Sequence, residues 1–250
     1  MTSLVFGLLP GWVWMLLAAP FAGSFLGLLA LRLPAGRPVV MARSACDHCG
    51  TPLGARELVP LLSYALQRGR CRHCLGTIDA VHPLMEIGCL IIAGWAACLV
   101  NGPALYASCL LGWVLLALAV ADWRSFLLPD PLTLPLLLLG LGVTEWLTPW
   151  DLADHAIAAI LGYALFRGLA LAYRHLRGRD GLGQGDAKLL TVAGAWVGLV
   201  ALPYVILIGA LFGIGLATAR KLRGEAVNAA TAVPFGPGLA LGLWLVWLYS

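Results

Sequence analysis

Long apolar segments dominate this chain and restrict its fold more than any other feature. Because 61% of the 250 residues are hydrophobic and 11% are charged, one water-soluble core could not cover this apolar surface. The runs are close to the roughly 17–25 residues that a helix needs to cross a bilayer. Eight candidate spans lie near 4–31, 84–100, 104–121, 131–148, 152–173, 187–201, 204–219 and 233–249. The sequence therefore predicts an all-α integral membrane protein, a polytopic helical bundle of about eight transmembrane helices in the lipid bilayer.

Prolines bear on two of these span assignments. The first run, 4–31, lacks the basic start of a signal peptide and exceeds its roughly 7–15 apolar residues. We therefore interpret it as a retained span bent at Pro10 and Pro20. The division between the sixth and seventh spans depends on Pro203 alone, because the apolar run there is nearly continuous. Seven spans would place the C-terminus on the opposite side of the membrane.

The basic residues indicate an orientation. If the N-terminus faces away from the cytoplasm, every Lys and Arg except Arg167 falls in a cytoplasmic loop or, for Lys188, at the edge of one. The opposite loops, around 101–103 and 148–151, carry no basic residue. This distribution obeys the positive-inside rule and predicts a periplasmic N-terminus. The formal net charge of +4 then reflects loops beside anionic lipid, so we expect no nucleic-acid partner.

One polar insertion interrupts the apolar pattern and is predicted to be cytoplasmic. It holds two Cys-x-x-Cys pairs, Cys46 with Cys49 and Cys71 with Cys74, in a compartment where disulfides are disfavoured. Four thiolates in paired knuckles match the tetrahedral, closed coordination of structural zinc. The predicted domains are a first transmembrane helix, a four-cysteine zinc-knuckle region and a membrane domain: 1–31, 32–83 and 84–250.

Free thiols and redox chemistry are the alternatives to metal binding at these cysteines. A Cys-x-x-Cys pair can also shuttle electrons, so a redox role stays open. His48 and His73 could each replace a thiol as ligand, although four cysteines already complete the coordination shell. Cysteines within the predicted spans are expected to act as small apolar residues. They are Cys89, Cys98 and Cys109.

Two acids at the ends of apolar segments are the candidate catalytic residues. Asp122 and Asp186 fall at predicted cytoplasmic ends of spans, 64 positions apart (186 − 122). An acid inside a bilayer is costly and often functional, but at a helix end water reaches it. Asp186 could also cap the helix that begins at Ala187. Position alone leaves both catalysis and helix capping open.

A pair of carboxyls is suited to cleaving peptides if the fold brings the two groups together. At hydrogen-bonding distance their charges cannot both persist, so one group keeps a proton while the other is ionised. A water between them can then be deprotonated as the scissile carbonyl is polarised, and the pair titrates as a unit. Gly181, Gly183 and Gly185 would let backbone or an extended substrate strand approach Asp186 closely.

The order of several motifs along the chain resembles a known family. Gly-Ser-Phe-Leu at 23–26 is followed by Arg-Leu-Pro at 32–34, by the two cysteine pairs and by the segments 58–64, 68–71 and 82–86. An Asp-(x)5-Leu-Pro-Asp block runs from Asp122 to Asp130, and Gly-Gln-Gly-Asp-Ala-Lys-Leu-Leu occupies 183–190. Together these motifs resemble the type IV prepilin peptidases, bifunctional leader peptidases and N-methyltransferases of the GxGD aspartyl protease class. The resemblance covers nearly the whole chain.

This resemblance implies roles for individual residues. Asp122 and Asp186 match the family's catalytic acids, which act at the cytoplasmic face of the bacterial inner membrane. The two cysteine pairs match its zinc-knuckle loop. Supporting roles are expected for four neighbours in the same motifs: Asp130, Gly183, Gly185 and Lys188.

The resemblance also implies substrates and cofactors. Family members cut prepilins and type II secretion pseudopilins after the glycine that ends a short basic leader, just ahead of an apolar helix. They then methylate the new N-terminus with S-adenosylmethionine. Gly27 stands where family members usually have asparagine, in a region associated with the methyltransferase activity. We expect an aspartic endopeptidase with structural zinc and with S-adenosylmethionine as methyl donor.

Two other functional classes are consistent with parts of the sequence. A membrane thiol oxidoreductase working through the cysteine pairs would require a reversible disulfide. A structural or transport membrane protein, which the composition alone favours, would cleave no substrate. Cleavage of a prepilin separates the peptidase from both.

Overall fold

The computed structural model describes residues 9–39, 44–178, 183–225 and 233–250. The chain divides into two compact units, Met1–Ala117 and Leu118–Ser250, with the boundary inside helix α5 (Gly102–Ser125). The described residues form helices and loops without a β-strand, so the predicted all-α fold is confirmed. The predicted domain boundaries after residues 31 and 83 stay predictions.

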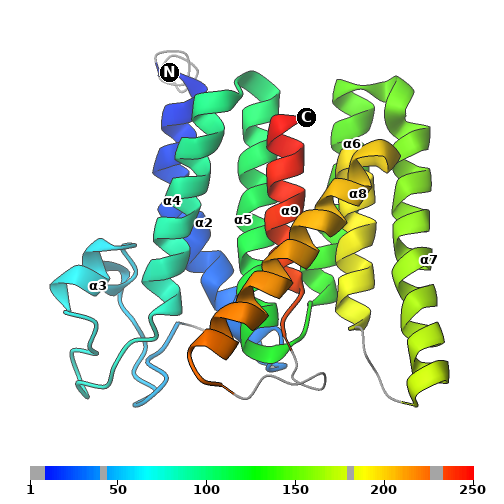
Figure 1. Cartoon of the computed structure of the whole chain (residues 1–250). Helices are drawn as coiled ribbons and strands as arrows, with labels where there is room; N and C mark the ends of the chain where they lie inside the picture. Colours follow the sequence, from blue (N-terminus) through cyan, green and yellow to red (C-terminus); the bar gives the residue numbers. More distant parts are fainter. Residues whose placement is uncertain (1–8, 40–43, 179–182, 226–232) are drawn as a thin grey trace. The chain divides into compact units, whose positions relative to one another are not determined.

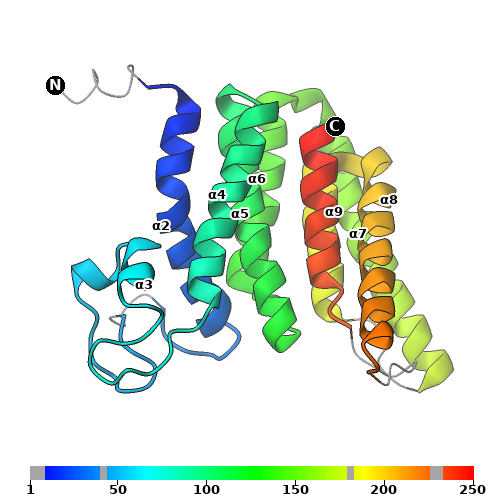
Figure 2. The same cartoon turned by 60° about the vertical axis from the view of Figure 1, so that its left-hand side comes forward.

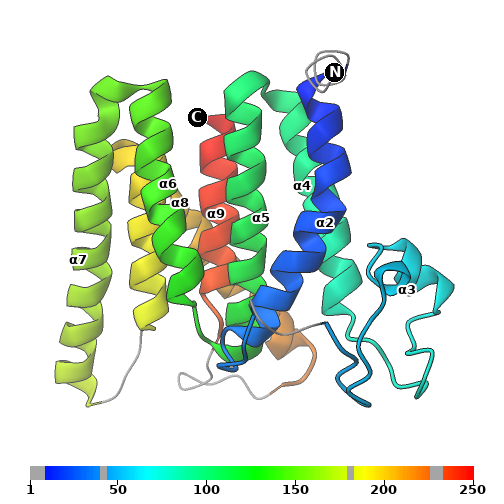
Figure 3. The ribbon, with the colours of Figure 1, turned by 180° about the vertical axis from the view of Figure 1, so that it is seen from behind.

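In the first unit, α2 (Gly11–Arg32) packs along α4 (Val81–Leu99), as Figure 3 shows. Gly23 and Gly27 lie four residues apart on the buried face of α2, a spacing of small residues that lets membrane helices approach closely. A Cβ on Gly23 would lie 2.6 Å from the carbonyl oxygen of Met85, so no larger residue fits there. The contact between the two helices therefore depends on glycine.

The polar insertion between α2 and α4 folds as a loop with two short helices, drawn in cyan in Figure 1. These are η1 (Ala55–Glu57) and α3 (Leu62–Leu66). Two isolated β-bridges, Ala45 with Pro52 and Arg70 with Thr77, close the two cysteine turns. The insertion therefore has local order although it contains only two short helices.

The second unit is a helical bundle around α8. Its members are the end of α5, α6 (Asp130–Leu147), η2 (Pro149–Asp151), α7 (Leu152–Arg177), α8 (Gln184–Leu222) and α9 (Gly236–Tyr249). Helix α8 lies against α6, α7 and α9 (Figure 2). The indole of Trp196 is buried in this bundle, where its Nε1–H donates to the carbonyl of Leu136 over 2.8 Å. At the contact of α8 with α9, a Cβ on Gly238 would lie 2.8 Å from the Gly209 carbonyl oxygen.

Helix α8 consists of two arms joined at Gly198. The backbone there has φ 71° and ψ −176°, and the second arm returns toward the end from which the first began (Figures 1 and 2). The break leaves the N–H of Leu199 without a helical acceptor, and it donates to Asp154 Oδ2 over 2.8 Å. The carboxylate of Asp154 thus caps the second arm.

The apolar run that predicted a sixth and a seventh span therefore does contain a turn, but the predicted position at Pro203 is wrong. The turn lies at Gly198, because a φ of 71° is open to glycine and strained for other residues. Pro203 falls just inside the second arm, near a helix start, where the missing N–H of proline is tolerated. The observed turn thus lies five residues before the proline from which it was predicted (203 − 198).

Five helices of the described part are long and apolar enough to cross a membrane, counting α8 once. Helix α6 adds 18 residues and α9 a shorter apolar helix of 14. Large apolar side chains such as Ile160 and Val200 are exposed on these helices, as expected of surfaces that face lipid. The chain is a multi-pass membrane protein, whereas the number of eight spans stays a prediction. The first predicted span appears as α2, which begins after Pro10 and contains Pro20, and residues 1–8 lie outside the described part.

Candidate active site and metal centre

Asp122 and Asp186 lie close together in the second unit. Asp122 is three residues before the end of α5, and Asp186 is in the first turn of α8. Both are buried, with 6% and 9% of their surface exposed, and the charge of Asp122 acts on Asp186. The fold therefore brings together two acids that are 64 positions apart in the sequence (186 − 122).

The turn after α5 holds Asp122 against the start of α8. The helix ends where Phe126 takes a left-handed φ of 55° and its N–H donates to the carbonyl of Asp122 over 2.9 Å. Leu128 in this turn is buried against Gly185, where a Cβ would lie 3.0 Å from Leu128 Cδ1. Gly185 therefore has a packing role, because its lack of a side chain lets the turn approach the helix that carries Asp186.

Gly183 stands at the N-terminal boundary of α8, directly beside the second acid. A Cβ at Gly183 would lie 3.1 Å from Asp186 Oδ2, a tighter contact than side chains usually make. Glycine thus leaves the carboxyl room at the helix start, in line with the close approach that the sequence predicted. Gly181, which belonged to the same prediction, lies outside the described residues.

Gly236 contacts Asp122 and was missed by the sequence analysis. Its backbone N–H, at the start of α9, donates to Asp122 Oδ2 over 3.0 Å. A Cβ at this position would lie 2.7 Å from the same oxygen. The signal in the sequence was the cluster Pro-Phe-Gly-Pro-Gly at 234–238, which lies at the start of the predicted span 233–249. The first N–H groups of a helix have no acceptor within the helix and can donate to a carboxylate, so the start of α9 orients Asp122.

Asp130 and Lys188 form an ion pair next to the two buried acids. Asp130 begins α6 directly after Pro129, and Lys188 follows Asp186 by half a turn in α8. Both side chains are partly exposed, which separates Asp130 from the buried carboxyls. The pair links the starts of α6 and α8, and the supporting roles of the two residues stay predictions.

Two neighbouring carboxyls in a buried setting can activate water. Because both charges cannot persist at short range, one carboxyl keeps a proton while the other stays ionised. The ionised member accepts a proton from water, and the protonated member donates a hydrogen bond to a carbonyl. This arrangement is suited to hydrolysis of a peptide bond at the end of the helical bundle.

The four predicted metal ligands converge in the first unit. The sulfur atoms of Cys46, Cys49, Cys71 and Cys74 all lie within 4.8 Å of one another. Each pair sits in the same kind of turn, closed by a backbone bond from the residue after the second cysteine to the first cysteine's carbonyl, at 2.9 Å and 3.0 Å. The residues at that position, Gly50 and Leu75, both have left-handed φ values of 69° and 59°. The two knuckles therefore share one backbone geometry.

The spacing of the sulfur atoms fits a tetrahedral metal site. With metal–sulfur bonds of about 2.3 Å, neighbouring thiolates in a tetrahedron are about 3.8 Å apart. Cys46 Sγ and Cys74 Sγ, from different knuckles, are 3.8 Å apart. Four cysteines in this cluster could hold a metal ion, as the Cys-x-x-Cys spacing predicted.

Comparison with known proteins identifies the family of this chain. Residues 17–100 match the Bacterial Peptidase A24 N-terminal domain, and residues 109–218 match the Type IV leader peptidase family. Relatives are more than 40% identical to this chain over more than four fifths of its length. The chain belongs to the type IV leader peptidase family. The resemblance drawn from the ordered motifs is thereby confirmed.

Several curated members of the leader peptidase family are similar over most of the chain, and each carries the name prepilin leader peptidase/N-methyltransferase. The protein of Burkholderia pseudomallei (strain 1026b) is 44% identical over 212 residues, which cover 84% of this chain and 68% of the relative. The protein of Aeromonas hydrophila is 41% identical, with 85% and 73% covered. That of Stutzerimonas stutzeri is 35% identical, with 92% and 79% covered. No solved structure matches the chain.

Electrostatics distinguish the four thiols of this family member when no metal is bound. The Thr51 hydroxyl, 3.2 Å from Cys49 Sγ, lowers the pKa of Cys49 to about 6. Backbone N–H groups of Cys74 and His73 lower the pKa of Cys71. At Cys74 the backbone bond from Gly76 opposes the shift, but desolvation and the neighbouring thiols raise its pKa to about 11. The cluster thus favours the thiolate form of Cys49 and Cys71 and the protonated form of Cys74. Such a division is expected where several negative sulfur atoms lie close together.

Proposed function

We propose that this chain cleaves the basic leader from type IV prepilins or type II secretion pseudopilins and then methylates the new N-terminus. The observation that carries the proposal is the burial of Asp122 and Asp186 side by side in a chain of the type IV leader peptidase family. The names of the curated relatives support both activities. An aspartic endopeptidase is the chemistry that two neighbouring carboxyls can perform without a bound metal.

In the proposed reaction, Asp122 and Asp186 share one proton and hold the attacking water. The ionised carboxyl takes a proton from water while the protonated carboxyl donates a hydrogen bond to the scissile carbonyl oxygen. The water oxygen bonds to the carbonyl carbon, the carbon–nitrogen bond then breaks, and the departing nitrogen receives a proton from the pair. Gly236 N–H keeps one oxygen of Asp122 in position throughout.

We place the acids and the cysteine loop on the cytoplasmic side, with the N-terminus in the periplasm of a bacterial inner membrane. Support comes from the basic residues, all but one of which fall in loops, or at the edge of a loop, on one side of the predicted topology. A basic leader that stays in the cytoplasm meets acids on that side. The apolar helix that follows the cleavage point of a prepilin would remain in the bilayer.

The cysteine cluster is proposed to bind one structural zinc ion. All four sulfur atoms lie within 4.8 Å of one another, and four protein ligands would complete the coordination of zinc, which favours a structural site over a catalytic one. The convergence of all four sulfur atoms also argues for a bound metal ion. An oxidoreductase would instead use two separate disulfides. Purified protein should contain one zinc per chain, and zinc-free protein with a reversible disulfide would favour the oxidoreductase.

The proposed peptidase can be tested with purified full-length protein and a prepilin in detergent. Asp122→Asn and Asp186→Asn should each lower leader cleavage by at least about 10³-fold, because the proton-sharing pair is lost. Asp151→Asn, at the opposite end of α7 from the start of α8, is the matched control and should cleave at the wild-type rate. Product masses report cleavage and methylation separately. Normal cleavage by either catalytic variant would show that the pair does not carry the reaction.

A further inference from the structure

Helix α3 exposes apolar side chains on the surface of the insertion. Leu62 and Leu66 have 56% and 68% of their surface exposed, and Ala65 between them is exposed as well. Residues three and four positions apart lie on the same side of a helix, so these three side chains form one surface. We call Leu62, Ala65 and Leu66 the apolar face of α3. Leu58 and Val59, in the turn that leads to α3, are also exposed.

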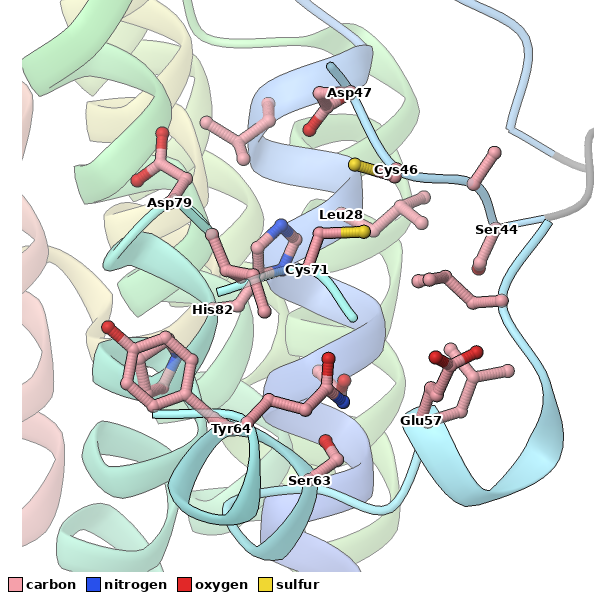
Figure 4. Close-up of a pocket in the computed structure, with 18 of the residues that line it drawn as sticks. Leu28, Ser44, Cys46, Asp47, Glu57, Ser63, Tyr64, Cys71, Asp79 and His82 are labelled. Atoms are coloured by element: carbon pink, nitrogen blue, oxygen red, sulfur yellow. The ribbon is translucent and has the colours of Figure 1, made fainter. Parts of the chain in front are cut away.

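The other side of α3 is polar and half-buried. Ser63, Tyr64 and Gln67 line a cavity of about 450 Å³, which α3 shares with the end of α2 and the start of α4 (Figure 4). Cys46 and Cys71 lie in the wall of the same cavity. A helix on a water-soluble surface has the opposite arrangement, with apolar side chains inward and polar side chains in water. The outer surface of α3 is therefore suited to apolar surroundings.

A hydrogen bond to a membrane helix fixes the position of α3 along the span. The backbone N–H of Leu61, the residue before α3, donates to Glu86 Oε2 over 2.6 Å. Glu86 is buried in the second turn of α4, a helix long and apolar enough to cross the membrane. It lies five residues after Val81, the first residue of α4, which is about 8 Å along the helix (86 − 81). Helix α3 therefore lies beside the beginning of a span rather than beyond it, as Figures 1 and 2 show.

The turn that leads into α3 is strained and is held by the same glutamate. Leu61 has φ 60° and ψ −51°, and the N–H of Leu62 donates to the carbonyl of Pro60 over 2.6 Å. This three-residue bond with a positive φ is a γ-turn, a rare conformation for a residue other than glycine. Because the buried Glu86 carboxylate binds the N–H of Leu61, the strained turn persists and sets which side of α3 points outward.

Basic side chains flank the apolar face. Arg56 precedes it and Arg68 and Arg70 follow it, and all three are exposed. Glu57 is the only acid between positions 55 and 70, and it lines the cavity. An apolar helix surface bordered by arginines complements the boundary between acyl chains and negatively charged headgroups. The combination therefore favours anionic phospholipid over a neutral apolar partner.

We propose that α3 lies in the headgroup region of the bilayer, with its apolar face against the acyl chains and the flanking arginines bound to anionic phospholipid. Helices of this kind sink about 5–10 Å into the headgroup boundary, which agrees with the position of α3 beside the first turns of α4. Leu84 and Ile87 in those turns of α4 are exposed too, so both elements present apolar surface at the same level. The contact holds the insertion, with its cavity and cysteines, at the membrane. It rests on the membrane class of the chain and not on the proposed peptidase.

Photo-crosslinking of the purified full-length protein in bilayer discs tests the proposal. A diazirine amino acid takes the place of one leucine at a time, at Leu62, at Leu66 or, as the matched control, at Leu75. Leu75 is as exposed as Leu66 but lies in the second cysteine turn. After irradiation, mass spectrometry should find phospholipid adducts at Leu62 and Leu66 at about ten times the yield at Leu75, because side chains in water meet few acyl chains. Thermal unfolding of each protein reports whether it remains folded.

The lipid found in the adducts tests the role of the arginines. In discs of phosphatidylcholine with a minor share of phosphatidylglycerol, adducts at Leu62 should contain phosphatidylglycerol at about five times its share of the bilayer, because basic side chains near the surface attract anionic lipid. Arg68→Gln and Arg70→Gln should each lower this enrichment. The matched control is Arg37→Gln, which should leave the enrichment unchanged, because the Arg37 guanidinium lies 3.8 Å from Asp47 and lines the cavity.

Three results would overturn the proposal. Equal adduct yields at Leu62, Leu66 and Leu75 would show that α3 faces water. Adducts to a second copy of the chain, or to an added prepilin, in place of lipid would show that the apolar face binds protein. Adducts that contain phosphatidylglycerol only in its bilayer share would show that the flanking arginines do not bind anionic lipid.

Discussion

Gly236 donates its backbone N–H to Asp122 Oδ2 over 3.0 Å, across 114 positions of sequence. The contact joins the start of α9 to the end of α5, and it leaves no room for a side chain at Gly236. One carboxyl of the pair is thereby oriented by a residue from a different part of the chain. Since reaction rates fall steeply when catalytic groups shift by an ångström, this glycine should matter for catalysis.

Gly236→Ala should lower the rate of leader cleavage by about 10²-fold, because its Cβ would lie 2.7 Å from Asp122 Oδ2 and displace that carboxyl. The matched control is Gly215→Ala on α8, where an added Cβ meets nothing within 4 Å. Steady-state cleavage of a prepilin gives kcat and KM for both variants. We expect kcat to fall with KM nearly unchanged, and a loss confined to KM would point to substrate binding instead.

Lys188→Met and Asp130→Asn should have much smaller effects than changes to the buried pair. Their ion pair is partly exposed, and such pairs contribute about 1 kcal/mol or less. We therefore expect each variant to keep its cleavage rate within about tenfold of wild type. In the double variant, the loss of activation free energy should not exceed the sum of the losses in the two single variants. Thermal unfolding of the four proteins in a double-mutant cycle measures the coupling. A loss as large as that of Asp186→Asn would place Asp130 among the catalytic acids.

Gly198→Ala should destabilise the second unit by at least about 2 kcal/mol, because φ 71° is strained for alanine. The new Cβ would also lie 2.5 Å from Asp154 Oδ2, the acceptor that caps the second arm of α8. Gly142→Ala on α6, where a Cβ meets nothing within 4 Å, is the control and should not lower the melting temperature. A melting temperature equal to that of wild type would show that the turn at Gly198 tolerates a side chain.

Thr51→Val should raise the pKa of Cys49 in the metal-free protein, since the Thr51 side chain is the largest cause of its low value of about 6. A folded pKa below the ordinary 9.0 stabilises the folded thiolate above pH 9, and this contribution is lost as the pH falls through about 6. Alkylation of Cys49 at pH 7 should therefore slow in the variant, as followed by mass spectrometry. Cys74, with its pKa raised to about 11, serves as the slow internal reference.

Local patterns in the sequence were sufficient to predict the helices and the cluster of four cysteines. Runs of apolar residues predict membrane helices because the bilayer requires every backbone group to be bonded within the segment. The two Cys-x-x-Cys pairs predict knuckles because a short turn alone brings each pair of sulfur atoms together. Leu75 is an exception. It has a left-handed φ of 59°, a backbone conformation for which glycine is the usual residue.

Packing across the bundle decided what the sequence left open. Whether Asp186 only caps α8 or also meets Asp122 depends on how the turn at Leu128 packs against Gly185. The contact of Asp122 with Gly236 and the pairing of Asp130 with Lys188 likewise join distant segments. The contacts at Gly185 and Gly236 depend on glycines that let segments approach closely, and no local pattern in the sequence predicts which helix will approach which.

The chain by itself therefore determined its membrane class, its cysteine cluster and the identity of two candidate acids, because these follow from local composition and spacing. Tertiary structure alone decided the turn at Gly198, the backbone donor at Gly236 and the cavity beside the cysteines. The reason is physical. Short-range backbone and solvation preferences depend on neighbouring residues in the sequence. Close contacts between helices form only when the whole bundle packs and excludes lipid and water.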